Sequence, residues 1–187
     1  MQTQTRDVVD IIRDQHSTIR RLFAEVTSAA PDRRGDAFQP LVRLLAVHET
    51  AEEEVVYPAI MKLGDDGATV AEERRAEEDQ AKKVLAELED LDASTVDFMV
   101  AFAAFEDDVE EHAQSEESTV LPLLLACTLD ERSTMGEAFQ AAEALAPTHA
   151  HRLAPESGIG NMLVGPFVAM VDRVRDAIHD ATHDATR

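Results

Sequence analysis

Apolar residues recur every three or four positions along most of this 187-residue chain. That spacing predicts amphipathic α-helices, because 3.6 residues make one helical turn. The first helix is expected over about residues 5–27. Its inward stripe consists of Val9, Ile12, His16, Ile19, Phe23 and Val26. No stretch shows the two-residue alternation of a half-buried β-strand.

Three further helices follow, separated by the polar segments 29–36, 64–68 and 91–94. The second begins near Asp36, with a stripe through Leu41, Leu45, His48, Glu52, Val55 and Ala59. The third carries Ala81, Val84, Leu85, Leu88 and Leu91. The fourth begins at Ser94 or Thr95 and continues through Phe98, Phe102, Phe105, Val109, His112, Glu116, Val120 and Leu123. Four such helices with short loops predict an all-α, up-and-down four-helix bundle.

The C-terminal third is less regular. A shorter helix is expected from about Asp130 to Leu145, then an irregular stretch over 147–161, then an amphipathic helix from near Pro166. This part is too small and too sparsely apolar to fold alone. We therefore predict one bundle domain over residues 1–127 and a helical extension, residues 128–187, packed on it.

Polar residues interrupt the apolar stripes of three helices at positions that should face the core. They are His16, His48, Glu52, His112 and Glu116. The last four come from a repeat: HETAEEEVVYP at 48–58 and HAQSEESTVLP at 112–122 share His-x-x-x-Glu-Glu-x-x-x-x-Pro. A His and a Glu four residues apart lie on one helix face. Buried carboxylates need a compensating partner, and a metal centre supplies one.

A metal-free interaction module is the alternative. A single inward histidine is usually a satisfied core residue, and a single glutamate in a stripe can reach solvent. Five such positions on three matching stripes favour a metal. Imidazole and carboxylate without thiolate suit iron or manganese, with zinc as a third possibility. By the same logic Glu53, Glu54, Glu117 and most of EERRAEED (72–79) are interpreted as a solvated face.

Charge and cysteine content narrow the partners. The chain has 38 acidic and 17 basic residues, a formal charge of −21. Such a surface repels phosphate, which argues against nucleic acid and anionic membranes as partners. The one cysteine, Cys127, cannot form an intramolecular disulfide. With neither a signal-like start nor an apolar stretch of membrane-spanning length, we expect a cytoplasmic protein. Oligomeric state is left open.

The early histidine, the two His-x-x-x-Glu motifs, Tyr57-Pro58 and the VLP at 120–122 together resemble the hemerythrin-like, His-His-Glu cation-binding proteins over about residues 7–126. The resemblance implies two iron ions with an oxo or hydroxo bridge, held by His and carboxylates from four helices. It also implies Glu52 and Glu116 as the bridging carboxylates. Relatives carry or sense O2, respond to nitric oxide or peroxide, or handle iron. These small molecules are the expected partners, and a peroxide-consuming enzyme or a cation buffer are the alternatives.

One family feature is missing, the histidine of the third helix. The corresponding stretch is AEEDQAKKVLAELE (76–89), and extending its apolar line backward leads to Glu78 and Arg74. We predict that Glu78 replaces that histidine as a ligand. Two alternatives stay open. His149 or His151 could complete the site from the extension, or Arg74 could neutralise Glu78 without a metal.

Overall fold

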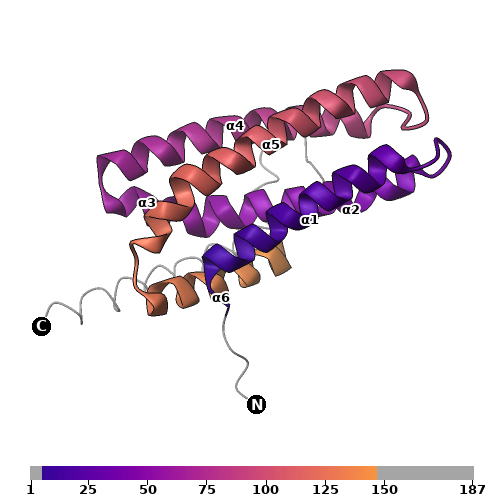
Figure 1. Cartoon of the computed structure of the whole chain (residues 1–187). Coiled ribbons are helices and arrows are strands. Elements are labelled where there is room, and N and C mark those ends of the chain that lie inside the picture. The colour runs from indigo at the N-terminus through magenta and orange to yellow at the C-terminus, as the bar shows by residue number, and fades with distance from the viewer. Residues whose placement is uncertain (1–5, 147–187) are drawn as a thin grey trace, which may run out of the picture.

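The computed structural model describes residues 6–146, and within that range the chain forms helices and no strand (Figure 1). The elements are α1 (Val8–Ser28), α2 (Arg34–Ala51), η1 (Glu52–Val56), α3 (Tyr57–Ile60), η2 (Met61–Leu63), α4 (Asp65–Glu89), α5 (Val96–Leu125) and α6 (Leu129–Leu145). The two long pairs α1–α2 and α4–α5 lie side by side, and α5 closes the bundle against α1. The predicted all-α, up-and-down bundle is confirmed.

Side-chain caps fix three helix starts, and the cap at Thr95 lies where the sequence predicts that the fourth helix begins. Asp7 accepts a hydrogen bond from the Val9 amide at 2.9 Å ahead of α1. Thr95 accepts one from the Phe98 amide at 3.2 Å ahead of α5. Thr128 and Glu131 form a reciprocal capping box at α6. Each cap satisfies an amide that has no partner inside its helix.

The third helix begins earlier than its apolar stripe indicates. The polar segment 64–68 predicts a break, but only Gly64 breaks the chain, with φ 115°, and α4 starts at Asp65. A positive φ of this size favours glycine, which has no β-carbon to clash with the backbone. Asp65 and Asp66 then suit the first turn, where the helix dipole favours negative charge.

The second helix is not the uniform helix that its stripe predicts. The five residues from Glu52 to Val56 form a π-helical turn, closed by the Tyr57 amide donating to the Glu52 carbonyl. Pro58 gives the physical reason, because a proline has no amide hydrogen and its ring clashes with the carbonyl four residues earlier. The wider turn inserts one extra residue. Tyr57 and Ile60 are therefore fully buried, whereas Ala59, the predicted stripe residue, is only half-buried.

Two apolar clusters fill the two ends of the bundle. One gathers residues such as Ile12, Val55 and Leu121; the other contains Phe23, Leu45 and Phe102. On each of the four long helical segments the buried polar position falls between the residues of these clusters. The bundle therefore has a polar waist between two hydrophobic ends.

Helix α6 shares the first cluster through Met135, Ala138 and Phe139, and it lies against α1 and α2 (Figure 1). Arg132 also pairs with the α1 cap residue Asp7 at 2.9 Å. The division of the chain at residue 127 stays a prediction, and the final helix expected from Pro166 lies outside the described residues. Within residues 6–146 no helix is both long enough and apolar enough to cross a membrane.

Close backbone contact between α6 and the start of α1 gives a stability prediction. A β-carbon at Gly136 would lie far inside van der Waals contact with the backbone carbonyl of Arg6, which cannot rotate away. Gly136→Ala should therefore lower the free energy of unfolding by about 1–3 kcal/mol. Gly35→Ala is the control, because its β-carbon would meet Ala93 at an ordinary 3.9 Å. Thermal denaturation of both variants checks this, and equal melting temperatures would contradict the packing described.

Candidate metal centre

Six side chains from five helical segments meet at the waist. His16 comes from α1, His48 from α2, Glu52 from η1, Glu78 from α4, and His112 and Glu116 from α5. They form two groups, His16/His48/Glu52/Glu116 and Glu52/Glu78/His112/Glu116, each with potential ligand atoms within 4.8 Å of one another. Glu52 and Glu116 belong to both groups. The structure thus brings together all six residues that the sequence favours as ligands.

The site is buried and strongly acidic. His16, Glu52, Glu78 and Glu116 are at most 1% exposed, and His48 is 3% exposed. Three carboxylates share this space, where little solvent can screen their repulsion. A cluster of this kind needs protons or cations to hold it together.

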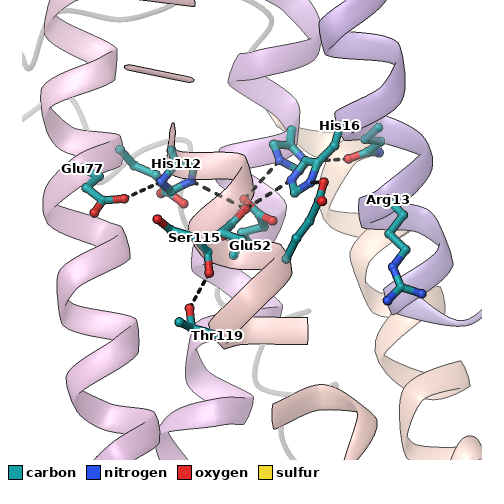
Figure 2. A network of polar contacts seen from close by, with 12 residues as sticks. Arg13, His16, Glu52, Glu77, His112, Ser115 and Thr119 are labelled. Carbon is teal, nitrogen blue, oxygen red and sulfur yellow. Dashed lines mark hydrogen bonds and ion pairs between the residues drawn. The ribbon is translucent and has the colours of Figure 1, made fainter. Parts of the chain in front are cut away.

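Two of the histidines are oriented by carboxylates behind them. The Nδ1 atom of His16 lies 3.0 Å from Glu117 Oε1, and that of His112 lies 2.8 Å from Glu77 Oε2. Figure 2 shows His112 between Glu77 and the buried carboxylates. Ionised carboxylates only accept hydrogen bonds, so each Nδ1 carries a hydrogen and each Nε2 faces the waist, where loss of its own proton would free a lone pair for a metal. Metal-binding histidines are typically held in this way.

His48 is held by an amide. Its Nδ1 lies 2.6 Å from Gln15 Oε1, and the Gln15 amide nitrogen donates to Glu143 on α6. Phe139, also on α6, packs edge-on against the His48 ring at 6.4 Å between centroids. Burial lowers the pKa of His48 to about 3, with His16 adding to the effect, so its ring is neutral at pH 7. Helix α6 therefore helps to position a residue of the centre.

The inward-facing nitrogens point at carboxylate oxygens. The Nε2 atoms of His16 and His112 lie 3.2 and 3.6 Å from Glu116 Oε2, and that of His48 lies 3.3 Å from Glu52 Oε2. The Nε2 atoms of His16 and His112 are buried without a hydrogen-bond partner among the described residues. The same is true of four carboxyl oxygens: both oxygens of Glu52, Glu78 Oε2 and Glu116 Oε2. Nitrogen and oxygen atoms that converge in this way without hydrogen-bond partners fit a cation between them.

The carboxyl groups respond to this crowding in different ways. Burial raises the pKa of Glu52 and of Glu78 well above the usual range, and neighbouring carboxylates add to both shifts. Burial also acts to raise the pKa of Glu116, but its contact with His16 and the neighbouring His112 outweigh it and lower the value to about 2. Burial and mutual repulsion thus disfavour the ionised forms of Glu52 and Glu78, whereas the contact with His16 favours the ionised form of Glu116.

Tyr57 adds an oxygen atom to the second group. Its hydroxyl is hydrogen-bonded to Glu78 Oε1 and lies 2.9 Å from Glu116 Oε1. The π-helical turn is what aims this fully buried side chain at the waist. The hydroxyl has one proton for two carboxyl groups, and the other oxygens of both, Glu78 Oε2 and Glu116 Oε2, have no hydrogen-bond partner among the described residues.

Sequence reasoning missed the carboxylates that orient the histidines. The helical pattern assigns Glu117 and Glu77 to a solvated face, yet they hold His16 and His112. No sequence spacing flags either residue, because their partners are on different helices from their own.

Arg74 does not neutralise Glu78, which the sequence left open. Its Nη2 atom lies 2.8 Å from Glu77 Oε1 instead, so this arginine pairs with the carboxylate that orients His112. His149 and His151, which could complete the site from the extension, lie outside the described residues. Among residues 6–146, Glu78 is therefore the third-helix donor that the geometry offers.

Comparison with known proteins decides the family. The hemerythrin HHE cation-binding domain profile matches residues 7–124. The chain belongs to this hemerythrin family. A hemerythrin-like protein of Schizosaccharomyces pombe with no characterised function is 29% identical over 172 residues, which covers 90% of this chain and 85% of that protein.

Two further matches show how widely the domain is used. A Nostoc protein described as a DNA nickase is 30% identical over 118 residues, 63% of this chain but 33% of that protein. The crystal structure of a hemerythrin HHE cation-binding domain-containing protein from Mycobacterium kansasii superposes with a TM-score of 0.66. It is 22% identical, and the match covers 74% of this chain and 86% of that one. At that identity the likeness establishes the fold alone.

The raised carboxyl pKa values predict how pH affects the metal-free protein. Near the centre Glu49 is also buried, and burial raises its pKa to about 8, with Lys82 opposing the shift. A raised folded-state pKa gives stability that is lost as pH rises toward that value. The neutral His48 acts oppositely, but only below its unfolded pKa of about 6.5. Between pH 6.5 and 8 Glu49 alone should therefore cost the stripped protein on the order of 1–2 kcal/mol of unfolding free energy, and Glu52 and Glu78 should add to the loss.

Chelator-treated protein melted at pH 6.5, 7.25 and 8 checks this prediction. Glu49→Gln should reduce the slope, because its side chain no longer releases a proton. A melting temperature that stays constant or rises with pH in the metal-free protein would contradict it.

Proposed function

We propose that the waist binds two metal ions and that both are iron. His16 and His48 would hold one ion, Glu78 and His112 the other, with Glu52 and Glu116 shared between them. The observation that carries the proposal is the division of six buried donors into two groups with two carboxylates in common. The unpartnered Nε2 and carboxylate oxygen atoms support it, because each has a lone pair free for a metal.

Donor chemistry supports iron or manganese, with zinc as a further candidate. Neither group contains a thiolate, and Cys127 belongs to neither. Imidazole and carboxylate oxygen are the donors of non-haem iron sites. Membership of the hemerythrin family adds weight to iron.

We propose further that the centre reacts with O2, nitric oxide or peroxide. When bound, an iron pair supplies a site where such small molecules bind and exchange electrons. Glu78 in place of a histidine adds negative charge, which stabilises the ferric state. A reversible O2 carrier must rest in the ferrous state, so peroxide or nitric oxide chemistry, or iron handling, suits this donor set better.

The resemblance to a DNA nickase does not carry that activity to this chain. The matched region is one third of the Nostoc protein. A formal charge of −21 repels the phosphate backbone of DNA. A cation buffer is the second candidate function, supported by the excess of carboxylates around the waist. Turnover of added peroxide by the loaded protein separates a reactive centre from a buffer.

Iron content is the first test. Protein purified from iron-replete cells should hold close to two iron ions per chain, and after exposure to air it should show oxo-to-iron charge-transfer absorption in the near ultraviolet. Metal analysis that finds no iron, manganese or zinc would refute the proposal. Glu78→Gln should lower the content toward one ion, whereas Glu72→Gln, an exposed acid on the same helix, should leave it at two.

The same absorption spectrum tests the role of Tyr57. A phenolate bound to ferric iron adds a visible charge-transfer band, and Tyr57→Phe would abolish it. A hydroxyl that only hydrogen-bonds to Glu78 and Glu116 adds no such band. We expect the band, because the Tyr57 hydroxyl contacts Glu78 and lies 2.9 Å from Glu116 Oε1, and both glutamates belong to the second group. Identical visible spectra for the two iron-loaded proteins would show that the phenol is not a ligand.

A further inference from the structure

A cavity of about 690 Å³ opens beside the waist and is lined by all four long helical segments. His16, His48, Glu78 and His112 line its inner end. Apolar side chains, among them Phe23, Leu45 and Val109, line the side toward the second cluster. The cavity therefore connects the proposed ligands with the surface over α5.

The outer part of this cavity is acidic. The run FEDDVEEH (105–112) contributes Glu106, Asp107, Asp108, Glu110 and Glu111 to its lining. Arg20 is the sole lysine or arginine among the lining residues, and it is paired with Glu110 at 2.7 Å and with Glu117 at 3.1 Å. A cleft lined by one sign of charge concentrates ions of the opposite sign.

Glu49 lies in the lining between the acidic mouth and the centre. It is 5% exposed, and Glu78 on the facing helix belongs to the same lining. Lys82 is the cation near this pair, but it is ion-paired with Glu53 and its Nζ stays 3.9 Å from Glu78 Oε2. That Glu78 oxygen has no hydrogen-bond partner among residues 6–146. Glu49 and Glu78 are thus two buried carboxyl groups that line one cavity. The nearby Lys82 is already ion-paired with Glu53.

We infer that this cavity is the entry route for ferrous ions and that Glu49, with Glu78, binds each ion in transit to the centre. The inference rests on the proposed function, because it presumes that the waist binds iron. Hard divalent cations favour carboxylate oxygens. The mouth attracts the ion, and Glu49 offers it a first buried oxygen ligand before the histidines complete its coordination.

The test is the rate of iron uptake. Metal-free, full-length protein is mixed anaerobically with ferrous sulfate, and unbound iron is trapped at intervals with a coloured ferrous chelator. Glu49→Gln keeps the shape of the side chain and removes a carboxyl group that binds a cation once its proton is released, so uptake at pH 8 and low ionic strength should slow about tenfold, the lower end of electrostatic rate effects. The final content should stay at two ions per chain, because Glu49 is not a proposed ligand of the finished centre.

Two further variants complete the design. Glu72→Gln removes an equal charge from α4 outside the cavity lining and should load at the wild-type rate. Asp107→Asn combined with Asp108→Asn and Glu111→Gln should slow uptake and weaken its dependence on salt, since these residues form the exposed rim.

The outcomes distinguish the proposed iron centre from the proposed entry route. Wild-type protein that takes up no iron would overturn both. Wild-type protein that binds two ions, with Glu49→Gln and the rim variant loading equally fast, would overturn the entry route alone. A Glu49→Gln protein that ends with fewer ions would make Glu49 a permanent ligand and would overturn its role in transit.

Discussion

Repulsion among buried carboxylates is the constraint around which this bundle is organised. Glu52, Glu78 and Glu116 point into one waist with almost no access to water. A tyrosine hydroxyl and three imidazole rings face their oxygen atoms, several of which have no hydrogen-bond partner among the described residues. A helix bundle built for stability alone would fill these positions with leucine, since an apolar replacement for buried charge is often neutral or stabilising. Their presence therefore indicates a cation, and two ions match the two overlapping donor groups.

The rest of the molecule holds those donors in place. Apolar clusters at both ends fix the helices, so the waist cannot collapse to satisfy its own polar atoms. A ring of partners, Gln15, Glu77 and Glu117, sets which nitrogen of each histidine faces inward. Helix α6 belongs to this support, because Glu143 holds Gln15 and Phe139 packs on His48. The segment after the fourth helix is thus more than a cover for the end of the bundle.

Helical periodicity predicts the four long helices and identifies all six residues that meet at the waist. It succeeds because side chains on one stripe must face the core, so a His or Glu on the stripe is conspicuous. Glu78 needs the family resemblance as well, because the missing third-helix histidine is what leads the apolar line of α4 back to this residue. Helical periodicity does not predict the π-helical turn, because a stripe assumes a constant number of residues per turn. Pro58 is the sequence feature that marks its place. Glu77 and Glu117 fall on the predicted surface because their role depends on contacts between helices, which one helix's pattern does not contain.

A crystal structure of the iron-loaded protein, with anomalous diffraction recorded at the iron edge, tests the central claim most directly. We expect two anomalous peaks in the waist, with Glu52 and Glu116 contacting both and a Glu78 oxygen at about 2.0–2.2 Å from one, judged by metal–carboxylate distances. A single peak, peaks elsewhere in the molecule, or a Glu78 carboxylate turned away from the metal would contradict the account.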